Sequence, residues 1–220
     1  MTRKLTYIDA LYAARRVADR AVETGIMLNR PPCRPIYHHM GAVLADATLQ
    51  AGLSYEKIIR PRIHYILERF PHASTTGSVI QIMQDEGTSK FLQWTHNEKI
   101  SRFENVVSFI SNARIENTDE LLMSLREETF CSGLQKIHGI GPKTIDYMAC
   151  LVGMDCVAVD RHVQNFAELA GLENNGYAYL RDVFNFAADL LDISRRDFDS
   201  LIWHYQAAQY KKQLELEFDK

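Results

Sequence analysis

The sequence predicts an all-α protein. Apolar residues recur at the three-to-four-residue spacing of an amphipathic helix along most of the chain. No run of alternating apolar and polar residues is long enough to propose a β-sheet. The chain has 220 residues, of which 46% are hydrophobic and 24% charged, so it can bury the core of one large domain or of two small ones.

The first helix is expected over residues 8–24, with an apolar stripe that includes Leu11 and Val17 and with Gly25 as its stop. Three prolines at positions 31, 32 and 35 then predict a linker. Pro61 is expected to kink or restart a later helix. The other helices are predicted from His38 to a break at Gly52, from a cap at Ser54 to residue 67, and over residues 77–85, 99–111, 119–127, 142–152, 161–170, 177–191 and 195–214.

The charge of the chain limits how it can bind nucleic acid. A formal net charge of −3 and a pI near 6.2 argue against a protein that grips DNA through bulk positive charge, so any DNA binding must be local. A basic run of Lys57, Arg60, Arg62 and Arg69 is diluted by neighbouring glutamates, and we interpret it as a solvated helix face.

Charged residues interrupt every apolar run near the N-terminus, so we expect neither a signal peptide nor a membrane span. The expected location is therefore intracellular, and cytoplasmic if the chain is prokaryotic. The four cysteines, Cys33, Cys131, Cys150 and Cys156, form no CxxC pair and lack the histidine spacing of a zinc site. They are expected to be reduced thiols, and no bound metal is predicted.

The segment from Ile137 to Thr144, IHGIGPKT, predicts a helix, a tight hairpin and a second helix. Gly139 and Gly141 are expected to permit a backbone that a Cβ would obstruct, and Pro142 suits the first turn of the second helix. Such a hairpin presents the N–H groups of the turn and of a helix N-terminus together, which favours binding to a phosphate oxygen. This kind of contact holds DNA without reading its sequence.

The alternative is a buried pair of helices whose glycines only allow close packing, because a G-x-G pair alone is a weak signal. The flanking apolar residues Leu134, Ile137 and Ile140 match the hairpin pattern as well and favour phosphate binding. The residues then expected at the DNA backbone are Gly139, Ile140, Gly141, Lys143 and Thr144.

Residues 134–163, LQKIHGIGPKTIDYMACLVGMDCVAVDRHV, closely resemble the helix-hairpin-helix, Gly/Pro-rich loop and aspartate signature of the DNA glycosylase superfamily that includes endonuclease III and the 8-oxoguanine DNA glycosylases. Weaker resemblance extends back to about Gly41, and DFDSLIWHYQAAQYKK resembles the helix that closes the family fold. The resemblance implies two helical lobes with a DNA-binding cleft between them. One lobe is a helical barrel over residues 38–158, and the other combines residues 1–37 with residues 159–220.

The resemblance also implies a catalytic pair. In the family, the lysine two residues after the second hairpin glycine is the Schiff-base nucleophile, and an aspartate in a V-D-x-H segment ends the following loop. Lys143 and Asp160 occupy those positions, 17 residues apart (160 − 143). That separation suits one helix over residues 142–152 and a return loop through Gly153, which lets both side chains face one cleft. Arg161 departs from the family, in which smaller or uncharged residues are usual at this position.

Both residue types suit the implied chemistry. Loss of a base develops positive charge on the deoxyribose, which the Asp160 carboxylate can stabilise, and this carboxylate can also accept a proton from Lys143. The neutral amine can then attack the sugar C1′ and form an imine, from which β-elimination cuts the strand. For this the pKa of Lys143 must fall below the ordinary value of about 10.4, as a place in the first helical turn and partial burial both favour. Each residue also has a simpler role, because Lys143 can be a phosphate contact and Asp160 can be the N-cap of the next helix.

Four more residues are candidates for the base pocket or for a wedge beside the flipped nucleotide. Asp146 and Tyr147 lie three and four residues beyond Lys143 and so project to nearly the same helix face. The Tyr147 ring suits stacking on a flipped base, and equally an ordinary place in the core. Gln50 occupies a Gln-Ala turn that the weaker resemblance equates with a wedge, and His162 follows Asp160 closely. The lesion stays open between oxidised purines, oxidised pyrimidines and bare abasic sites.

No cysteine follows Cys156, so the iron–sulfur cluster of many endonuclease III relatives is not expected. The resemblance allows a monovalent cation at the hairpin and implies no other cofactor. The expected partner is damaged double-stranded DNA, bound by a monomer that is associated with the nucleoid if the chain is prokaryotic.

Two other functions remain open at this stage. In a monofunctional glycosylase, Asp160 would support base release while Lys143 only contacted the backbone. In a non-catalytic helix-hairpin-helix module, the chain would recognise DNA structure or dock a partner. The near-neutral charge favours the docking module slightly, whereas the spacing of Lys143 and Asp160 favours an enzyme.

Overall fold

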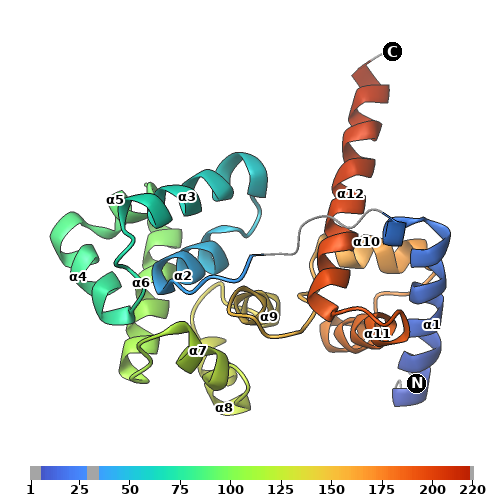
Figure 1. The fold of residues 1–220 in the computed structure, drawn as a ribbon, viewed down its shortest axis with the longest axis horizontal. Helices are drawn as coiled ribbons and strands as arrows, with labels where there is room; N and C mark the ends of the chain where they lie inside the picture. Colours follow the sequence, from blue (N-terminus) through green and yellow to red (C-terminus); the bar gives the residue numbers. More distant parts are fainter. Residues whose placement is uncertain (1–5, 29–34, 219–220) are drawn as a thin grey trace. The chain divides into compact units, whose positions relative to one another are not determined.

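The computed structural model describes residues 6–28 and 35–218, and their side chains as far as residue 209. The described residues form α-helices, short helical turns and connecting loops, without a β-strand, which confirms the all-α class (Figure 1). None of their helices is long and apolar enough to cross a membrane. The α-helices are α1 (Tyr7–Glu23), α2 (Met40–Leu49), α3 (Arg60–Arg69), α4 (Thr76–Glu86), α5 (Thr88–Leu92), α6 (Asn97–Asn112), α7 (Thr118–Ser124), α8 (Glu128–Leu134), α9 (Pro142–Leu151), α10 (Arg161–Leu169), α11 (Tyr177–Leu190) and α12 (Arg195–Phe218).

The chain divides into two compact units. Unit 1 combines residues 1–34 with residues 155–220, and unit 2 is the continuous segment 35–154. The lobes expected from the sequence had their boundaries at residues 38 and 158. Pro31, Pro32 and Cys33 lie outside the described residues.

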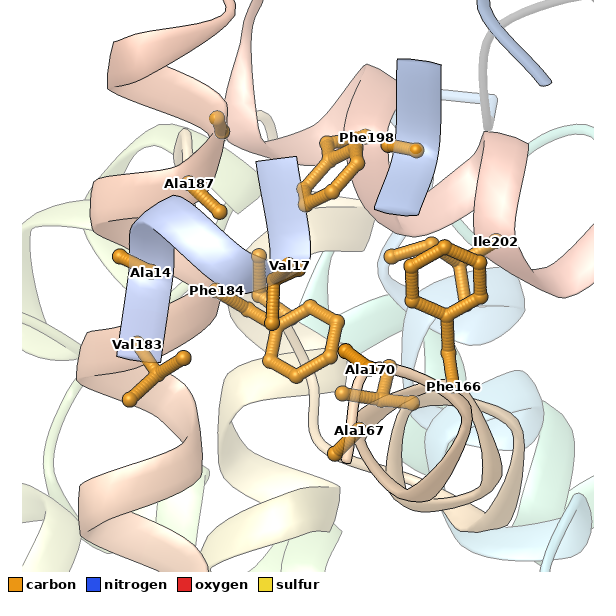
Figure 2. Packing of buried hydrophobic residues seen from close by; sticks show 14 of the residues in the cluster. Ala14, Val17, Phe166, Ala167, Ala170, Val183, Phe184, Ala187, Phe198 and Ile202 are labelled. Atoms are coloured by element: carbon orange, nitrogen blue, oxygen red, sulfur yellow. The ribbon is translucent and has the colours of Figure 1, made fainter. Parts of the chain in front are cut away.

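Unit 1 is built from α1, α10, α11 and α12 around one apolar cluster. Phe184 of α11 and Phe198 of α12 lie beside Val17 of α1, and the two phenyl centroids are 6.0 Å apart (Figure 2). The buried side of α1 consists mainly of small residues, which lets α11 approach closely. The expected stripe on α1 was wrong at Leu11, which is 39% exposed, because the buried face is centred on neighbouring alanines and Leu11 falls at its edge.

Unit 2 is organised around α2, in which every residue from Met40 to Leu49 is buried. A helix that is apolar on nearly all sides belongs in the middle of a bundle, and α2 packs against α3, α4, α6 and α9. His39 caps its N-terminus, because Nδ1 accepts the Ala42 N–H at 3.0 Å while Nε2 lies 2.9 Å from the Phe70 carbonyl oxygen. The central position of α2 places Asp46, its one acidic residue, in the interior of the unit.

Two helix boundaries followed the predicted signals. Gly25 has a φ of +68° just after α1, and Pro61 lies in the first turn of α3, so the expected stop and restart are confirmed. Before α3 the chain makes a π-helical turn, Tyr55–Ile59, for which the Ser54 hydroxyl accepts the Lys57 N–H. The turn adds one residue to the ordinary helical hydrogen-bond loop, because the Arg60 N–H donates to the Tyr55 carbonyl.

Candidate functional site

The segment predicted as a hairpin forms a turn between two helices of unit 2. Helix α8 ends at Leu134, residues 135–141 form the turn, and α9 begins at Pro142 with Gly141 as its N-cap. Ile140 is only 4% exposed, and its N–H donates to the Ile137 carbonyl at 3.0 Å. The Ile140 side chain therefore ties the turn to the interior, and the Ile140 N–H closes the turn onto Ile137.

Position 139 requires a glycine. Its φ is +81°, a conformation that L-residues rarely adopt, and a Cβ there would collide with the guanidinium group of Arg102 from α6. Arg102 is buried, and its Nε donates to the His138 carbonyl at 3.1 Å while Nη2 donates to Glu98 at 2.9 Å. The Arg102 side chain thus fills the space that the missing Cβ leaves, and its hydrogen bond to the His138 carbonyl holds the turn. The sequence carries no signal for this contact, because 36 residues separate its partners.

Gly141 differs from the expectation. Its φ of −111° and ψ of 179° are extended values that any residue adopts, and a Cβ there would have no atom within 4 Å. The prediction that a Cβ would obstruct the backbone was wrong at this glycine. Gly141 instead leaves an uncovered approach to the first turn of α9.

The turn carries backbone donors that the described chain does not use. The N–H groups of Gly139 and Gly141 have no hydrogen-bond acceptor among the described residues. Thr144 and Ile145 both direct their N–H groups to the Gly141 carbonyl, at 3.0 and 3.2 Å, so α9 winds directly from the turn. Unused donors at a helix N-terminus are the chemical requirement for binding an anion.

Lys143 is the second residue of α9 and is half-buried. Its Nζ lies 5.1 Å from the centroid of the Tyr147 ring, one helical turn further along α9. This distance is within the range of an attractive cation–π interaction. Asp146, on the same turn of α9, is half-buried, and Thr144 is buried.

Tyr147 is buried, and its hydroxyl donates a hydrogen bond of 3.1 Å to Oδ1 of Asp46 on α2. Oδ2 of the same carboxylate lies 3.2 Å from the Tyr55 hydroxyl and 3.4 Å from the Tyr37 hydroxyl. Burial and the neighbouring Asp46 charge raise the pKa of Tyr37 above its ordinary range. We name Asp46, Tyr37, Tyr55 and Tyr147 the tyrosine–aspartate cluster. Sequence reasoning identified Tyr147 but missed the other three residues.

Gln50, the candidate wedge, is the C-cap of α2. Its Nε2 atom is buried and has no hydrogen-bond partner among the described residues. The ammonium group of Lys99 from α6 donates hydrogen bonds to the carbonyl oxygens on both sides of Gln50. These are the carbonyls of Leu49 and of Ala51, the latter at 2.8 Å. Burial and the nearby Arg102 lower the pKa of Lys99. Lys99 therefore fixes the backbone of the Gln50 turn, a role that sequence reasoning missed.

Asp160 and His162 belong to unit 1. Asp160 is the N-cap of α10, where its Oδ1 accepts the N–H groups of His162 at 2.8 Å and of Val163 at 3.1 Å. The N-cap role expected as the simpler alternative is thus present. Within unit 1, no described residue hydrogen-bonds to Oδ2 of Asp160. The His162 ring packs edge-on against Trp203 of α12, with the centroids 5.9 Å apart, and Arg161 is exposed.

The candidate residues thus fall into two groups. Unit 2 holds Gln50, the turn with Gly139, Ile140 and Gly141, and the α9 residues Thr144, Asp146 and Tyr147 together with Lys143. Unit 1 holds Asp160 with His162 at the start of α10. The first group lies on the first half of α9, on the turn before it and at the end of α2, and the second lies at the start of α10.

The basic run, which extends from the π-helical turn into α3, is only partly a solvated face. Arg60 pairs with Glu56 at 2.7 Å and Arg69 lies 3.8 Å from Glu86, and both arginines are exposed. Arg62 is half-buried, with Nη1 donating to the Ile58 carbonyl at 2.6 Å and its guanidinium 4.8 Å from the Trp94 ring centroid. The expectation of a solvated side chain was therefore wrong for Arg62, whose guanidinium connects α3 to the segment before α6.

No protein-family model matches the sequence, and neither a curated protein nor a solved structure is significantly similar to it. Among the described residues, no group of three or more histidine, cysteine, aspartate or glutamate side chains is arranged to hold a metal ion.

Proposed function

We propose that this chain is a DNA glycosylase that removes a damaged base from duplex DNA and then cleaves the abasic strand through Lys143. The observation that carries the proposal is the start of α9. There an exposed glycine turn with unused N–H donors leads directly into a half-buried lysine, at the positions where the sequence resembles the glycosylase signature.

The turn supplies the contact with the DNA backbone. A phosphate oxygen that accepts the Gly139 and Gly141 N–H groups would satisfy both donors at the positive end of the α9 dipole. The uncovered space at Gly141 lets a phosphodiester approach the backbone closely. Such contacts are independent of sequence, as a repair enzyme that searches for a lesion needs. They also allow binding by a chain whose net charge is −3.

Asp160 supplies electrostatic stabilisation of base loss. As the bond between C1′ and the base breaks, its electron pair leaves with the base and the sugar becomes positively charged. The cap hydrogen bonds hold the Asp160 carboxylate through Oδ1 and fix its orientation, while Oδ2 stays available within unit 1. A carboxylate held in advance stabilises the developing charge without reorganisation.

Lys143 supplies the covalent step. Its neutral amine forms a bond to C1′ as the base departs with its electron pair, and the departing base takes up a proton. Loss of the second amine proton and opening of the sugar ring give an imine. Removal of a C2′ proton then expels the 3′ phosphate with the electrons of the C3′–O bond, and water releases the lysine. The strand is cut without a cofactor.

The proposal is tested with duplexes that each contain one lesion: an oxidised purine, an oxidised pyrimidine or an abasic site. We expect base release on at least one of them, strand cutting, and a covalent complex after borohydride reduction. Lys143→Gln is expected to abolish the covalent complex, whereas the matched control Lys136→Gln, at an exposed position of the same turn, is expected to retain it. Intact lesions throughout, with salt-dependent binding retained, would show a non-catalytic DNA-binding module instead.

One observation favours a monofunctional enzyme as the second candidate. The Tyr147 ring attracts Lys143 as the charged ammonium, which is the form suited to a phosphate contact rather than to nucleophilic attack. Base release that persists in Lys143→Gln, without a trapped complex from the unmodified chain, would establish this candidate. In either case we expect a monomer that acts on damaged DNA inside the cell.

A further inference from the structure

The tyrosine–aspartate cluster contains a carboxylate in a place that is costly for a charge. Asp46 is fully buried in the middle of α2. An ionised carboxylate accepts hydrogen bonds only, and the hydroxyls of Tyr147, Tyr55 and Tyr37 lie 3.1, 3.2 and 3.4 Å from its oxygens. Three O–H donors offset much of the desolvation of the charge. The Asp46 charge also raises the pKa of Tyr37.

Tyr147 connects this carboxylate to Lys143. The hydroxyl end of the tyrosine is held by Asp46 of α2, and its ring lies 5.1 Å from the Lys143 ammonium. The ring is buried and is therefore fixed both by packing and by its hydroxyl. Tyr55 and Tyr37 hold the other carboxylate oxygen and belong to segments outside α9.

From this geometry we propose that Asp46 is a positioning residue for Lys143 and acts through Tyr147. A hydrogen bond to a carboxylate makes the phenol ring more electron-rich, which strengthens its attraction for an ammonium group. A lysine side chain that nothing restrains samples many rotamers, at an entropic cost of up to about 2 kcal/mol when it is fixed. The anchored ring restricts those rotamers and holds Nζ at one place beside the first turn of α9. The inference rests on the proposed role of Lys143.

The direct test is an NMR experiment on the full chain that does not depend on enzymatic activity. Reductive methylation with ¹³C-formaldehyde labels the lysine amines, and Lys143→Arg identifies the Lys143 signal by its disappearance. We expect the Lys143 methyl protons to be shifted upfield of exposed lysines, because Nζ faces the Tyr147 ring. Tyr147→Phe removes only the hydroxyl that Asp46 holds, so the shift should decrease.

Tyr65→Phe is the matched control, because it removes one tyrosine hydroxyl from α3 in the same unit and leaves Asp46 and the Tyr147 anchor in place. We expect the wild-type Lys143 shift in this variant. Asp46→Asn should reduce the shift, as Tyr147→Phe does, and the Phe variant keeps the test decisive if the Asn variant does not fold. A Lys143 shift that is the same in Tyr147→Phe as in the wild type would overturn the proposal.

Borohydride trapping on abasic duplex separates this inference from the proposed function. We expect Tyr147→Phe to trap about 10- to 100-fold more slowly than the wild type, because a misplaced nucleophile loses that order of rate, and the control Tyr65→Phe to trap normally. Absence of trapping by the wild-type chain would refute the lyase function, and the NMR comparison would still decide whether Asp46 positions Lys143. Normal trapping and a normal shift in Tyr147→Phe would refute the positioning role alone.

Discussion

Gly139 and Gly141 stand two residues apart in one turn, yet the structure gives them different reasons to be glycine. Gly139 has a positive φ and lies against the Arg102 guanidinium, whereas Gly141 has an ordinary backbone and open space around its Cα. A sequence pattern treats the two alike, because neither φ nor the neighbouring side chain is visible in it. The difference becomes measurable when a single methyl group is added to each.

We expect Gly139→Ala to lower the free energy of unfolding by about 2 kcal/mol or more, because the alanine must adopt a left-handed backbone and displace Arg102. Gly141→Ala should change it by less than about 1 kcal/mol, in either direction. Urea denaturation of the two variants and the wild type measures both values. Equal destabilisation by the two alanines would mean that Arg102 does not determine the cost.

The raised pKa of Tyr37 predicts how the stability of the fold depends on pH. Its pKa is raised in the folded chain by burial and by Asp46, so the folded protein retains the phenol proton when the unfolded chain releases it. The stabilisation is complete below the ordinary tyrosine pKa of about 10 and is lost as the pH rises above that value. Denaturation between pH 9 and pH 11 should show a steeper loss of stability in the wild type than in Tyr37→Phe. Parallel pH profiles for the two proteins would contradict the shift.

At the level of elements, local signals predicted helix ends well and short helices poorly. Asn117 accepts two N–H groups at the start of α7, and Ser194 accepts the Asp197 N–H at the start of α12, a role that Asn and Ser side chains commonly have at helix N-termini. Helix α5 was missed, because five residues make too few turns for a periodic apolar pattern to emerge, and the helix expected before the hairpin, α8, already ends at Leu134.

The candidate site shows the same limit. The α9 residues and the Asp160 cap could be located from local sequence, whereas the bond between Asp46 and Tyr147 joins residues 101 positions apart. Contacts of this kind depend on how helices pack, which an isolated sequence does not reveal. Three of the residues that sequence reasoning missed, Asp46, Lys99 and Arg102, each act from a helix outside the segment that they support.

Arg102 links α6 to the turn between α8 and α9 through its hydrogen bond to the His138 carbonyl. Replacing it with methionine keeps the side-chain length but removes the donor to the His138 carbonyl and the pair with Glu98. We expect a loss of about 1.5 to 3 kcal/mol of stability, the range for a hydrogen bond from a charged group. Hydrogen exchange should accelerate in residues 135–141 more than in α2. Unchanged exchange in the turn would show that Ile140 alone holds it.

The Asp160 cap can be separated from the proposed chemistry, because asparagine caps a helix as well as aspartate does. Asp160→Asn should therefore retain the stability of the wild type while losing base excision by several orders of magnitude. Asp160→Ala should lose excision and also about 1 kcal/mol of stability, since the His162 and Val163 N–H groups lose their acceptor. Thermal denaturation and single-turnover base release measure the two effects. Normal excision by Asp160→Asn would remove Asp160 from the mechanism.

At the scale of the whole molecule, the two units divide the proposed activity. Unit 2 contains the turn, Lys143 and the tyrosine–aspartate cluster in one continuous segment, whereas Asp160 belongs to unit 1, which joins both ends of the chain. Unit 2 also has its own buried centre in α2. A continuous segment with its own core is the arrangement from which independent folding is expected.

We therefore expect a fragment of residues 35–154 to unfold cooperatively on its own and to bind abasic duplex with a marked dependence on salt. The fragment should leave every damaged base in place, because it lacks the Asp160 carboxylate that stabilises charge on the sugar. Circular dichroism during denaturation, fluorescence anisotropy and a base-release assay measure the three properties, and the same fragment with Gly139→Ala controls for binding outside the turn. Base release by the fragment at the full-length rate would show that the chemistry lies within unit 2 alone, and Asp160 would then be a helix cap and nothing more.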